Sequence, residues 1–258
     1  MKVTNLIAVT AIAASSLFLS TLPATAHDGH ETSKEATAAV MNSNRPEADV
    51  ARDGARKPAE VLSFYGVKPG MTVLDMFSSG GYYTAVLSNL VGEDGKVYAH
   101  NSANGKESRG EALAEKYKAF PNVELKWTAP AEQALADNSV DAVFIVLIYH
   151  HLHYSEADGE MTPASTKKLF AEVKRVLKPG GVFGVIEHTA AAGTTRAQSA
   201  KWHRAPAQTA IDDITAAGFE YVGEGGMHVN ADDDLKNVWG ESGLRGKTTR
   251  FVQKYVNK

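Results

Sequence analysis

The sequence contains no cysteine. Disulfide bonds, thiolate zinc sites, iron–sulfur clusters and a cysteine nucleophile are therefore excluded. It also lacks a basic excess, because 27 Lys and Arg residues stand against 30 Asp and Glu residues and give a formal net charge of −3. Nucleic-acid-binding domains usually carry such an excess, so we predict no nucleic-acid partner. The 43% hydrophobic and 22% charged content is ordinary for a globular protein, and 258 residues suffice for one large α/β domain.

The first 26 residues have the pattern of a secretory signal peptide. Lys2 is followed by an apolar stretch diluted by Thr and Ser, which ends in the small residues Ala24-Thr25-Ala26. The alternative is a membrane-spanning helix, but the stretch is short for one, and small residues stand where a signal peptidase cuts. We expect cleavage before His27, a periplasmic or secreted mature chain, and no stable membrane anchor after cleavage.

The rest of the chain divides into a lead-in and one domain. Residues 27–56 are polar and alanine-rich, so we expect a flexible lead-in with one short helix near Ser33–Met41. From residue 57 to 258, strand and helix patterns alternate. The expected strands are 71–77, 96–101, 123–128, 142–149, 182–187, 219–222 and 249–255. The expected helices begin at Pro58 and Pro163 or span 83–91, 111–120 and 207–217. This alternation predicts a doubly wound, mostly parallel α/β sheet with right-handed crossovers.

Polar and small residues follow the strands at the edge where such sheets bind ligands. Ser78-Ser79-Gly80-Gly81 follows the first strand, where small residues let the backbone approach a ligand. Histidines follow the two central strands, in the segments Tyr149-His150-His151-Leu152-His153 and Glu187-His188, and His203-Arg204 comes later. Imidazole is both the proton shuttle of neutral pH and a common metal ligand, so these histidines are the main candidates for chemistry.

Three interpretations of the histidines remain open. In the first, they line a substrate pocket, and His150 or His188 is a general base. In the second, His150, His188 and His203 bind zinc or another divalent ion together with Glu187. In the third, they hydrogen-bond loops and take no part in chemistry. A polar loop, Tyr154–Asp158, follows His151 and His153, so we expect both of these side chains to be solvated, and we assign no metal ligand.

The order of motifs resembles that of the class I S-adenosylmethionine-dependent methyltransferases. The motifs are V-L-D-x-F-x-x-G-G-Y-Y-T from residue 73, then G-K-V-Y-A, D-A-V-F and V-L-K-P-G-G-V-F. The sequence resembles more closely an exported bacterial branch of predicted methyltransferases, through Tyr149-His150, Glu187-His188 and His203-Arg204. The resemblance covers roughly residues 45–256.

The resemblance implies a fold, a cofactor and a site. It implies a methyltransferase-like domain over residues 57–258, with a seven-stranded Rossmann-like sheet whose last strand is antiparallel. It implies S-adenosyl-L-methionine as cofactor and a small molecule as methyl acceptor. The residues implied to bind the cofactor are Asp75, Ser78, Ser79, Gly80, Gly81, Asn101 and Glu132. The catalytic candidates are His150, His188 and Tyr149, and the substrate-binding candidates are Glu187, His203 and Arg204.

The sequence departs from the usual family pattern at two places. Aligned on Asp75, the three glycines of acid-x-Gly-x-Gly-x-Gly become Phe77, Ser79 and Gly81, and the usual acid after the second strand is Asn101. An amide lacks the charge-assisted hydrogen bonds that a carboxylate offers to a ribose diol. These departures favour an alternative function, in which a non-catalytic extracytoplasmic protein binds a ligand or metal in the same cleft.

Overall fold

The computed structural model of this chain describes residues 31–153, 163–241 and 243–258. The expected signal peptide, residues 1–26, lies outside these ranges. Within the three described ranges, no helix combines the length and the apolar character that a membrane crossing requires.

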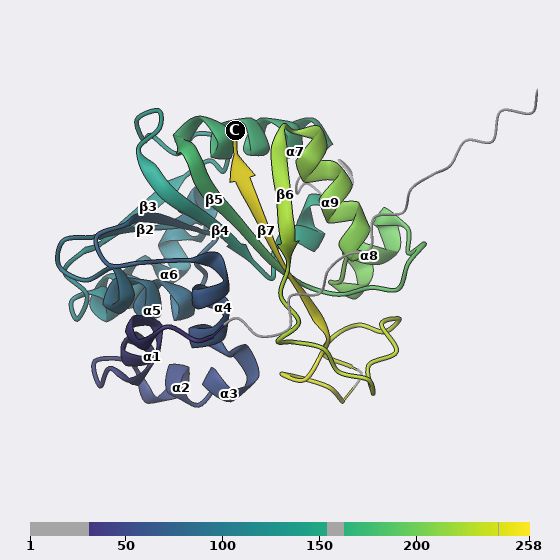
Figure 1. Cartoon of the computed structure of the whole chain (residues 1–258), viewed down its shortest axis with the longest axis horizontal. Coiled ribbons are helices and arrows are strands. Elements are labelled where there is room, and N and C mark those ends of the chain that lie inside the picture. The colour runs from purple at the N-terminus through teal and green to yellow at the C-terminus, as the bar shows by residue number, and fades with distance from the viewer. Residues whose placement is uncertain (1–30, 154–162, 242) are drawn as a thin grey trace, which may run out of the picture.

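Seven strands form one sheet in the order β3-β2-β1-β4-β5-β7-β6 (Figure 1). Their bounds are β1 Thr72–Met76, β2 Lys96–Ser102, β3 Val123–Thr128, β4 Val140–Val146, β5 Leu177–His188, β6 Phe219–Glu224 and β7 Arg250–Asn257. Strand β7 pairs antiparallel with β5 and β6, whereas the pairs among β1 to β5 are parallel. The predicted mostly parallel sheet with an antiparallel last strand is confirmed.

Helices lie on both faces of the sheet (Figure 1). The larger ones are α4 Pro58–Tyr65, α5 Tyr82–Val91, α6 Lys106–Tyr117, α7 Pro163–Val176 and α9 Ala207–Ala216. The sequence reading missed the short helix α8, Arg196–Trp202. Its start is marked by a capping box in which Thr195 accepts from the backbone N–H of Gln198, and the Gln198 side chain accepts from that of Thr195.

Strand β4 shows why the predicted apolar run is continuous. Val143 and Ile145 belong to the core cluster beneath α7 and α9, whereas Ala142 and Phe144 belong to the cluster beneath α4 and α5. Successive side chains of a strand point to opposite faces, so a strand covered on both faces needs apolar residues at every position. The run nevertheless ends as strand at Val146, and Tyr149–His153 forms a 3-10 turn, η2.

The segment Lys178-Pro179-Gly180-Gly181 lies within β5 and does not separate two elements. Helix α7 ends at Val176, and β5 begins at Leu177, which pairs with Val140. The register then shifts before Ala142 pairs with Val182, as in a β-bulge. The expected turn is therefore absorbed as an irregularity at the start of the strand.

The lead-in contains the short helix expected near Ser33–Met41 and two further helices that were not expected. Residues 34–56 form three helices, α1 Lys34–Met41, α2 Glu47–Val50 and α3 Asp53–Arg56, and α1 packs against α4 and α5. Ala36 is fully buried, and Arg45 pairs with Asp53 at 2.7 Å. The Tyr82 hydroxyl also donates to Asp53 at 2.5 Å. Polar contacts hold α3 in place, and the apolar periodicity of a sequence does not predict such contacts.

Candidate functional site

The loop after β1 is anchored by a buried carboxylate. Asp75 is 2% exposed, and it accepts a 2.6 Å hydrogen bond from the hydroxyl of Thr84 on α5. Burial raises the pKa of Asp75 to about 6, although the hydrogen bond from Thr84 acts in the opposite direction. Asp75, which the resemblance implies to bind the cofactor, thus ties the end of β1 to α5.

The same loop carries left-handed backbone at alternate positions. The φ angles are +56° at Phe77, +53° at Ser79 and +71° at Gly81. Left-handed backbone strongly favours glycine, because a Cβ atom crowds the following carbonyl. At Gly81 an added Cβ would also lie 2.2 Å from the hydroxyl oxygen of Tyr117. These positions align with the three glycines of the usual family motif, and two of them carry a side chain here.

Asn101, at the end of β2, holds this loop in place. Its amide oxygen accepts from the Ser79 N–H at 3.0 Å, and its amide nitrogen donates to the Ser78 hydroxyl at 2.8 Å. Its side chain is buried, with 2% exposed. The contacts of Asn101 therefore indicate that it positions the loop. The resemblance implied a different role for it, a contact with the ribose of the cofactor.

His100 ties the ends of three neighbouring strands together. Its Nδ1 accepts from the Phe77 N–H at 3.4 Å, and its Nε2 lies 3.1 Å from the Thr128 carbonyl oxygen. This pattern requires the neutral ring with the proton on Nε2. Burial lowers the pKa of His100 to about 4, so the ring stays neutral at physiological pH. The sequence reading gave this residue no role, because it counts as one more residue of a buried strand.

Two cavities flank the loop. One of about 160 Å³ is lined by Asp75 and by Ser78, Ser79 and Gly80. The other, of about 720 Å³, is lined by Ser102, Thr128, Pro130, Ala131 and His151, among others. Phe77 and Ile148 line both, so these two side chains stand at the boundary between the cavities. Glu132, expected near the adenine, is exposed and is not part of the lining of either cavity.

Two arginines of the lead-in reach the smaller cavity. Arg52 and Arg56 line it together with Tyr82 and Tyr83. Each guanidinium lies over the Tyr82 ring, at 4.9 Å for Arg52 and 4.6 Å for Arg56. Arg52 also pairs with Asp49. Sequence reasoning missed both arginines because it set residues 27–56 apart from the domain.

The structure brings three of the predicted site residues together at the ends of β4 and β5. The Glu187 carboxylate is fully buried and accepts from the His150 backbone N–H at 3.0 Å and from its Nδ1 at 2.8 Å. His150 Nε2 lies 3.0 Å from Nδ1 of His203. Burial acts to raise the pKa of Glu187, but the charge and hydrogen bonds of His150 outweigh burial and hold it below its usual range.

His151 joins this group, contrary to the expectation that it is solvated. Its side chain is half-buried, and its ring centroid lies 4.3 Å from that of His150 and 5.9 Å from that of His203. One ligand nitrogen from each of the three imidazoles lies within 4.8 Å of the others. His150 and His151 are neighbours in η2, and the fold brings His203 to them from 53 positions beyond His150 in the sequence.

His188 and Tyr149 lie in other surroundings. The His188 ring is stacked on Trp239, with centroids 5.2 Å apart, and its Nδ1 lies 2.7 Å from the Thr248 hydroxyl. Burial lowers the pKa of His188 to about 3. Tyr149 is fully buried, and its hydroxyl donates to Asp213 on α9 at 2.6 Å. These contacts give both side chains packing roles, which the catalytic interpretation did not anticipate.

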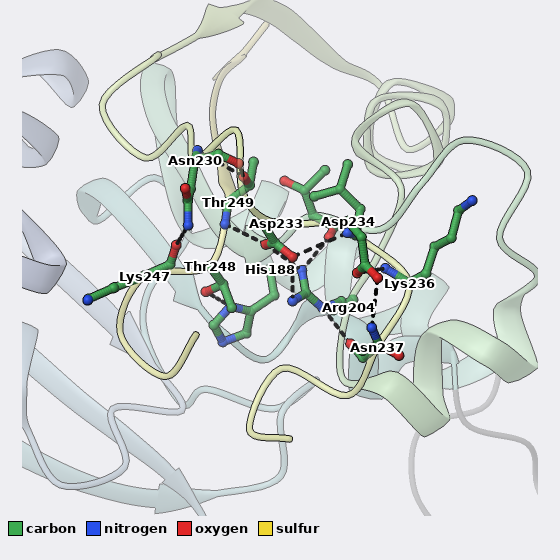
Figure 2. Close-up of polar contacts among 12 residues, drawn as sticks. His188, Arg204, Asn230, Asp233, Asp234, Lys236, Asn237, Lys247, Thr248 and Thr249 are labelled. Atoms are coloured by element: carbon green, nitrogen blue, oxygen red, sulfur yellow. Dashed lines mark hydrogen bonds and ion pairs between the residues drawn. The ribbon is translucent and has the colours of Figure 1, made fainter. Parts of the chain in front are cut away.

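Arg204 does not present its guanidinium to a substrate. It is fully buried and forms a two-pronged ion pair with Asp233, at 2.9 and 3.0 Å (Figure 2). It also donates to the carbonyl oxygens of Thr189 and Asn237. Asp233 in turn accepts from the backbone N–H of Thr249 (Figure 2). Arg204 therefore fastens the long segment between β6 and β7 to the carboxyl edge of the sheet.

Comparison with known proteins is consistent with this geometry. Residues 74–185 match the methyltransferase domain family. Over 122 residues the chain is 30% identical to a ubiquinone/menaquinone biosynthesis C-methyltransferase of Klebsiella pneumoniae, covering 47% of this chain and 44% of that protein. It is 31% identical over 127 residues to a sterol 24-C-methyltransferase of Gibberella zeae, covering 47% of this chain and 29% of that protein. The chain thus spans less than half the length of these relatives.

Solved structures share the whole fold. A SAM-dependent methyltransferase from Aquifex aeolicus aligns with a TM-score of 0.56 at 23% identity, covering 80% of this chain and 98% of that one. Aeropyrum pernix fibrillarin with natively bound S-adenosyl-L-methionine aligns with a TM-score of 0.51 at 14% identity, covering 80% and 76%. The fold is that of the Rossmann-like methyltransferases.

Proposed function

We propose that this protein is an S-adenosylmethionine-dependent methyltransferase that acts on a small molecule. The loop after β1 carries the proposal. Left-handed backbone at a residue other than glycine costs roughly 1–2 kcal/mol, yet the chain keeps it at Phe77 and Ser79. Strain of this kind persists where the surrounding structure holds it and clusters at ligand sites. Asn101 and His100 supply the hydrogen bonds that hold it here.

The two cavities fit the two ends of the cofactor. The smaller cavity, with Arg52 and Arg56 in its lining, suits the amino-acid end, whose carboxylate an arginine binds well. The larger cavity, with Pro130 and Ala131 in its lining, suits the adenosine. Phe77 stands between them. When bound, the cofactor supplies an electrophilic methyl group to an acceptor nucleophile.

The protein's part in such a transfer is positioning. Methyl transfer requires an in-line approach, exclusion of water and, for some acceptors, a base. Glu187 orients His150, and His151 connects this group to the larger cavity, so the acceptor end of the site lies at the histidines. His203 completes that end, whereas His188, Tyr149 and Arg204 support it through packing. The small-molecule acceptor is also consistent with the sterol and quinone names of the two relatives.

Calorimetric titration of the purified chain with S-adenosylmethionine and S-adenosylhomocysteine tests the proposal. We expect one site per chain, weakened at least about tenfold in Arg56→Met, because the variant removes the cation that would bind the carboxylate. Arg196→Met is the matched control, since Arg196 pairs with Asp213 outside the cavities and its loss leaves the affinity unchanged. Absence of binding at millimolar cofactor would refute the cofactor assignment and leave the fold.

We further propose that the protein works outside the cytoplasm after cleavage before His27. The support is the pattern of Lys2, an apolar stretch and Ala24-Thr25-Ala26. Protein isolated from its natural host, fractionated and sequenced from its N-terminus, should begin at His27 in the extracytoplasmic fraction. A cytoplasmic chain that retains Met1 would contradict this proposal without affecting the cofactor titration.

A further inference from the structure

We propose that His150, His151 and His203 form a binding site for a divalent transition-metal ion of the zinc type. The three imidazoles come from two separate segments, the η2 turn after β4 and the residue that follows α8. One nitrogen of each lies within 4.8 Å of the other two. The three donors are imidazole nitrogens and none is a carboxylate oxygen, which favours zinc and its neighbours over magnesium or calcium.

The spacing of the nitrogens suits such an ion. His150 Nε2 and His203 Nδ1 are 3.0 Å apart. In a tetrahedral zinc site with Zn–N distances of about 2.0–2.1 Å, neighbouring nitrogens are about 3.4 Å apart. The His151 nitrogen lies within 4.8 Å of the other two nitrogens. It must move by roughly 1–2 Å to reach the N–N distance of about 3.4 Å. Rotation of one half-buried ring supplies a movement of this size.

Glu187 has the position of a supporting carboxylate. Metal-bound histidines usually donate their second ring nitrogen to a carboxylate, which fixes the ring and raises its basicity. Nδ1 of His150 lies 2.8 Å from the fully buried Glu187 carboxylate, and its Nε2 is therefore directed toward the other two histidines. The buried negative charge also offsets the charge of a bound cation.

The backbone at His203 supports a functional role. His203 caps α8 in the left-handed conformation, with φ of +52° and ψ of +47°, where glycine or asparagine is usual. A strained residue retained in a cluster is typical of ligand sites. His151 lines the cavity of about 720 Å³, so a fourth coordination position is open on that side. Three histidines with one open position is the arrangement of a catalytic zinc site.

The histidines of this cluster differ from those of the metal site that the sequence suggested. That site combined His150 and His203 with His188 and placed Glu187 among the ligands. The structure turns His188 toward Trp239 and Thr248, puts His151 in its place, and moves Glu187 to a supporting position. The site does not depend on the proposed methyl transfer, because it needs no cofactor.

The test is metal binding by the full chain, measured after chelator treatment. Zinc titration by competition with a chromophoric chelator should give one tight site, and cobalt(II) should give the intense visible bands of a tetrahedral nitrogen site. His151→Asn and His203→Asn should each weaken zinc more than about 100-fold, beyond the 10–100-fold expected for Glu187→Gln as a supporting residue. The cobalt bands should disappear in both histidine variants.

His228→Gln is the matched control, because it removes a buried histidine that lies outside the cluster. It should keep the zinc affinity and the cobalt spectrum. Circular dichroism verifies that each variant is folded, and the half-buried positions of His151 and His203 make folding of those variants the expected result. Zinc binding that is absent at micromolar metal, or equally tight in His151→Asn and His203→Asn, would overturn the proposal. Cofactor titration of the metal-free chain remains an independent measurement.

Discussion

Phe77 is the side chain that most directly limits the proposed cofactor cleft. It occupies a position where the family motif has glycine, holds a φ of +56°, and lines both cavities. Its ring meets that of His100 edge-on, with centroids 5.3 Å apart. The residue therefore combines backbone strain with a ring at the boundary of the two cavities.

We expect Phe77→Gly to bind S-adenosylmethionine about tenfold more tightly, which corresponds to about 1.4 kcal/mol. The substitution removes the ring from the boundary and suits the left-handed backbone. Calorimetry measures the affinity. Ser79→Gly is the control, because it relieves the backbone at φ +53° without opening the boundary. An equal gain in both variants would assign the effect to strain and not to the ring.

Asp75 should make the protein less stable as pH rises. Its pKa is about 6 in the folded state and near 3.8 in the unfolded chain, so the folded state binds the proton more tightly. The stability gained from that proton is present below pH 3.8 and is lost as pH rises to 6 and beyond. The full effect is on the order of 3 kcal/mol.

Asp75→Asn, which mimics the protonated acid, should therefore match the unmodified chain near pH 4 and exceed its free energy of unfolding at pH 7.5. Urea unfolding at both pH values measures the difference. A difference that does not change with pH would show that Asp75 has an ordinary pKa.

The segment between β6 and β7 has little secondary structure of its own, and a buried ion pair holds it in place. Within its described residues it forms turns and bends, and the Arg204–Asp233 pair, both side chains fully buried, ties it to the end of β5 (Figure 2). Trp239 of the same segment covers His188. The edge of the site thus depends on a contact between residues 29 positions apart in the chain.

Arg204→Met should lower the free energy of unfolding by about 3–5 kcal/mol, because it leaves Asp233 as an unpaired buried charge. Urea unfolding measures this loss. Quenching of the tryptophan fluorescence by a soluble quencher should also increase, because Trp239 becomes more exposed. The half-exposed pair of Arg196 and Asp213 provides the comparison, and Arg196→Met should cost less than about 1 kcal/mol. Similar losses in the two variants would refute the fastening role.

For the whole chain, buried neutral histidines should make the fold sensitive to acid. Burial lowers the pKa of His100 to about 4 and that of His228 to about 3, below the 6.5 of an unfolded histidine. The unfolded state then binds more protons below pH 6.5. The stability is complete above pH 6.5 and is lost as pH falls toward 4, at about 1.4 kcal/mol per pH unit for each histidine. Between pH 6 and 4, protonation of Asp75 raises the free energy of unfolding as the pH falls, by about as much per pH unit as one histidine lowers it.

Urea unfolding between pH 7 and 4.5 should show this decline in the unmodified chain. In each of the variants His100→Gln and His228→Gln, the free energy of unfolding should fall less steeply with pH, by about 1.4 kcal/mol per pH unit. Glutamine keeps hydrogen-bonding capacity near the ring position but does not titrate. An unchanged slope in both variants would mean that other groups cause the acid sensitivity.

Local pattern was sufficient to predict the alternation of strands and helices, whereas the antiparallel last strand was implied only by the resemblance to a family. Apart from the start of β5, which lies five residues before its expected position, the strands lie within a few residues of their expected bounds. Apolar runs and helical stripes indicate which face of an element is buried, and this does not require knowledge of the element packed against it. The order of alternation then fixed a parallel sheet, since few topologies connect such elements without crossing. Asp75 and the small residues after β1 were placed for the same reason, at the end of a strand where a ligand would lie.

Only the tertiary structure decided which polar side chains meet. The sequence indicated His150, Glu187 and His203 as candidates, but it also indicated His188 and Arg204, and nothing local separates the two groups. His151 belongs to the cluster because the fold brings His203 next to η2, where His150 and His151 are neighbours. Arg56 lines the small cavity because the lead-in, which contains the Arg45–Asp53 ion pair, lies against the domain. Periodicity records burial along one element, whereas the partner of a polar group depends on contacts between distant segments, and those exist only once the chain has folded.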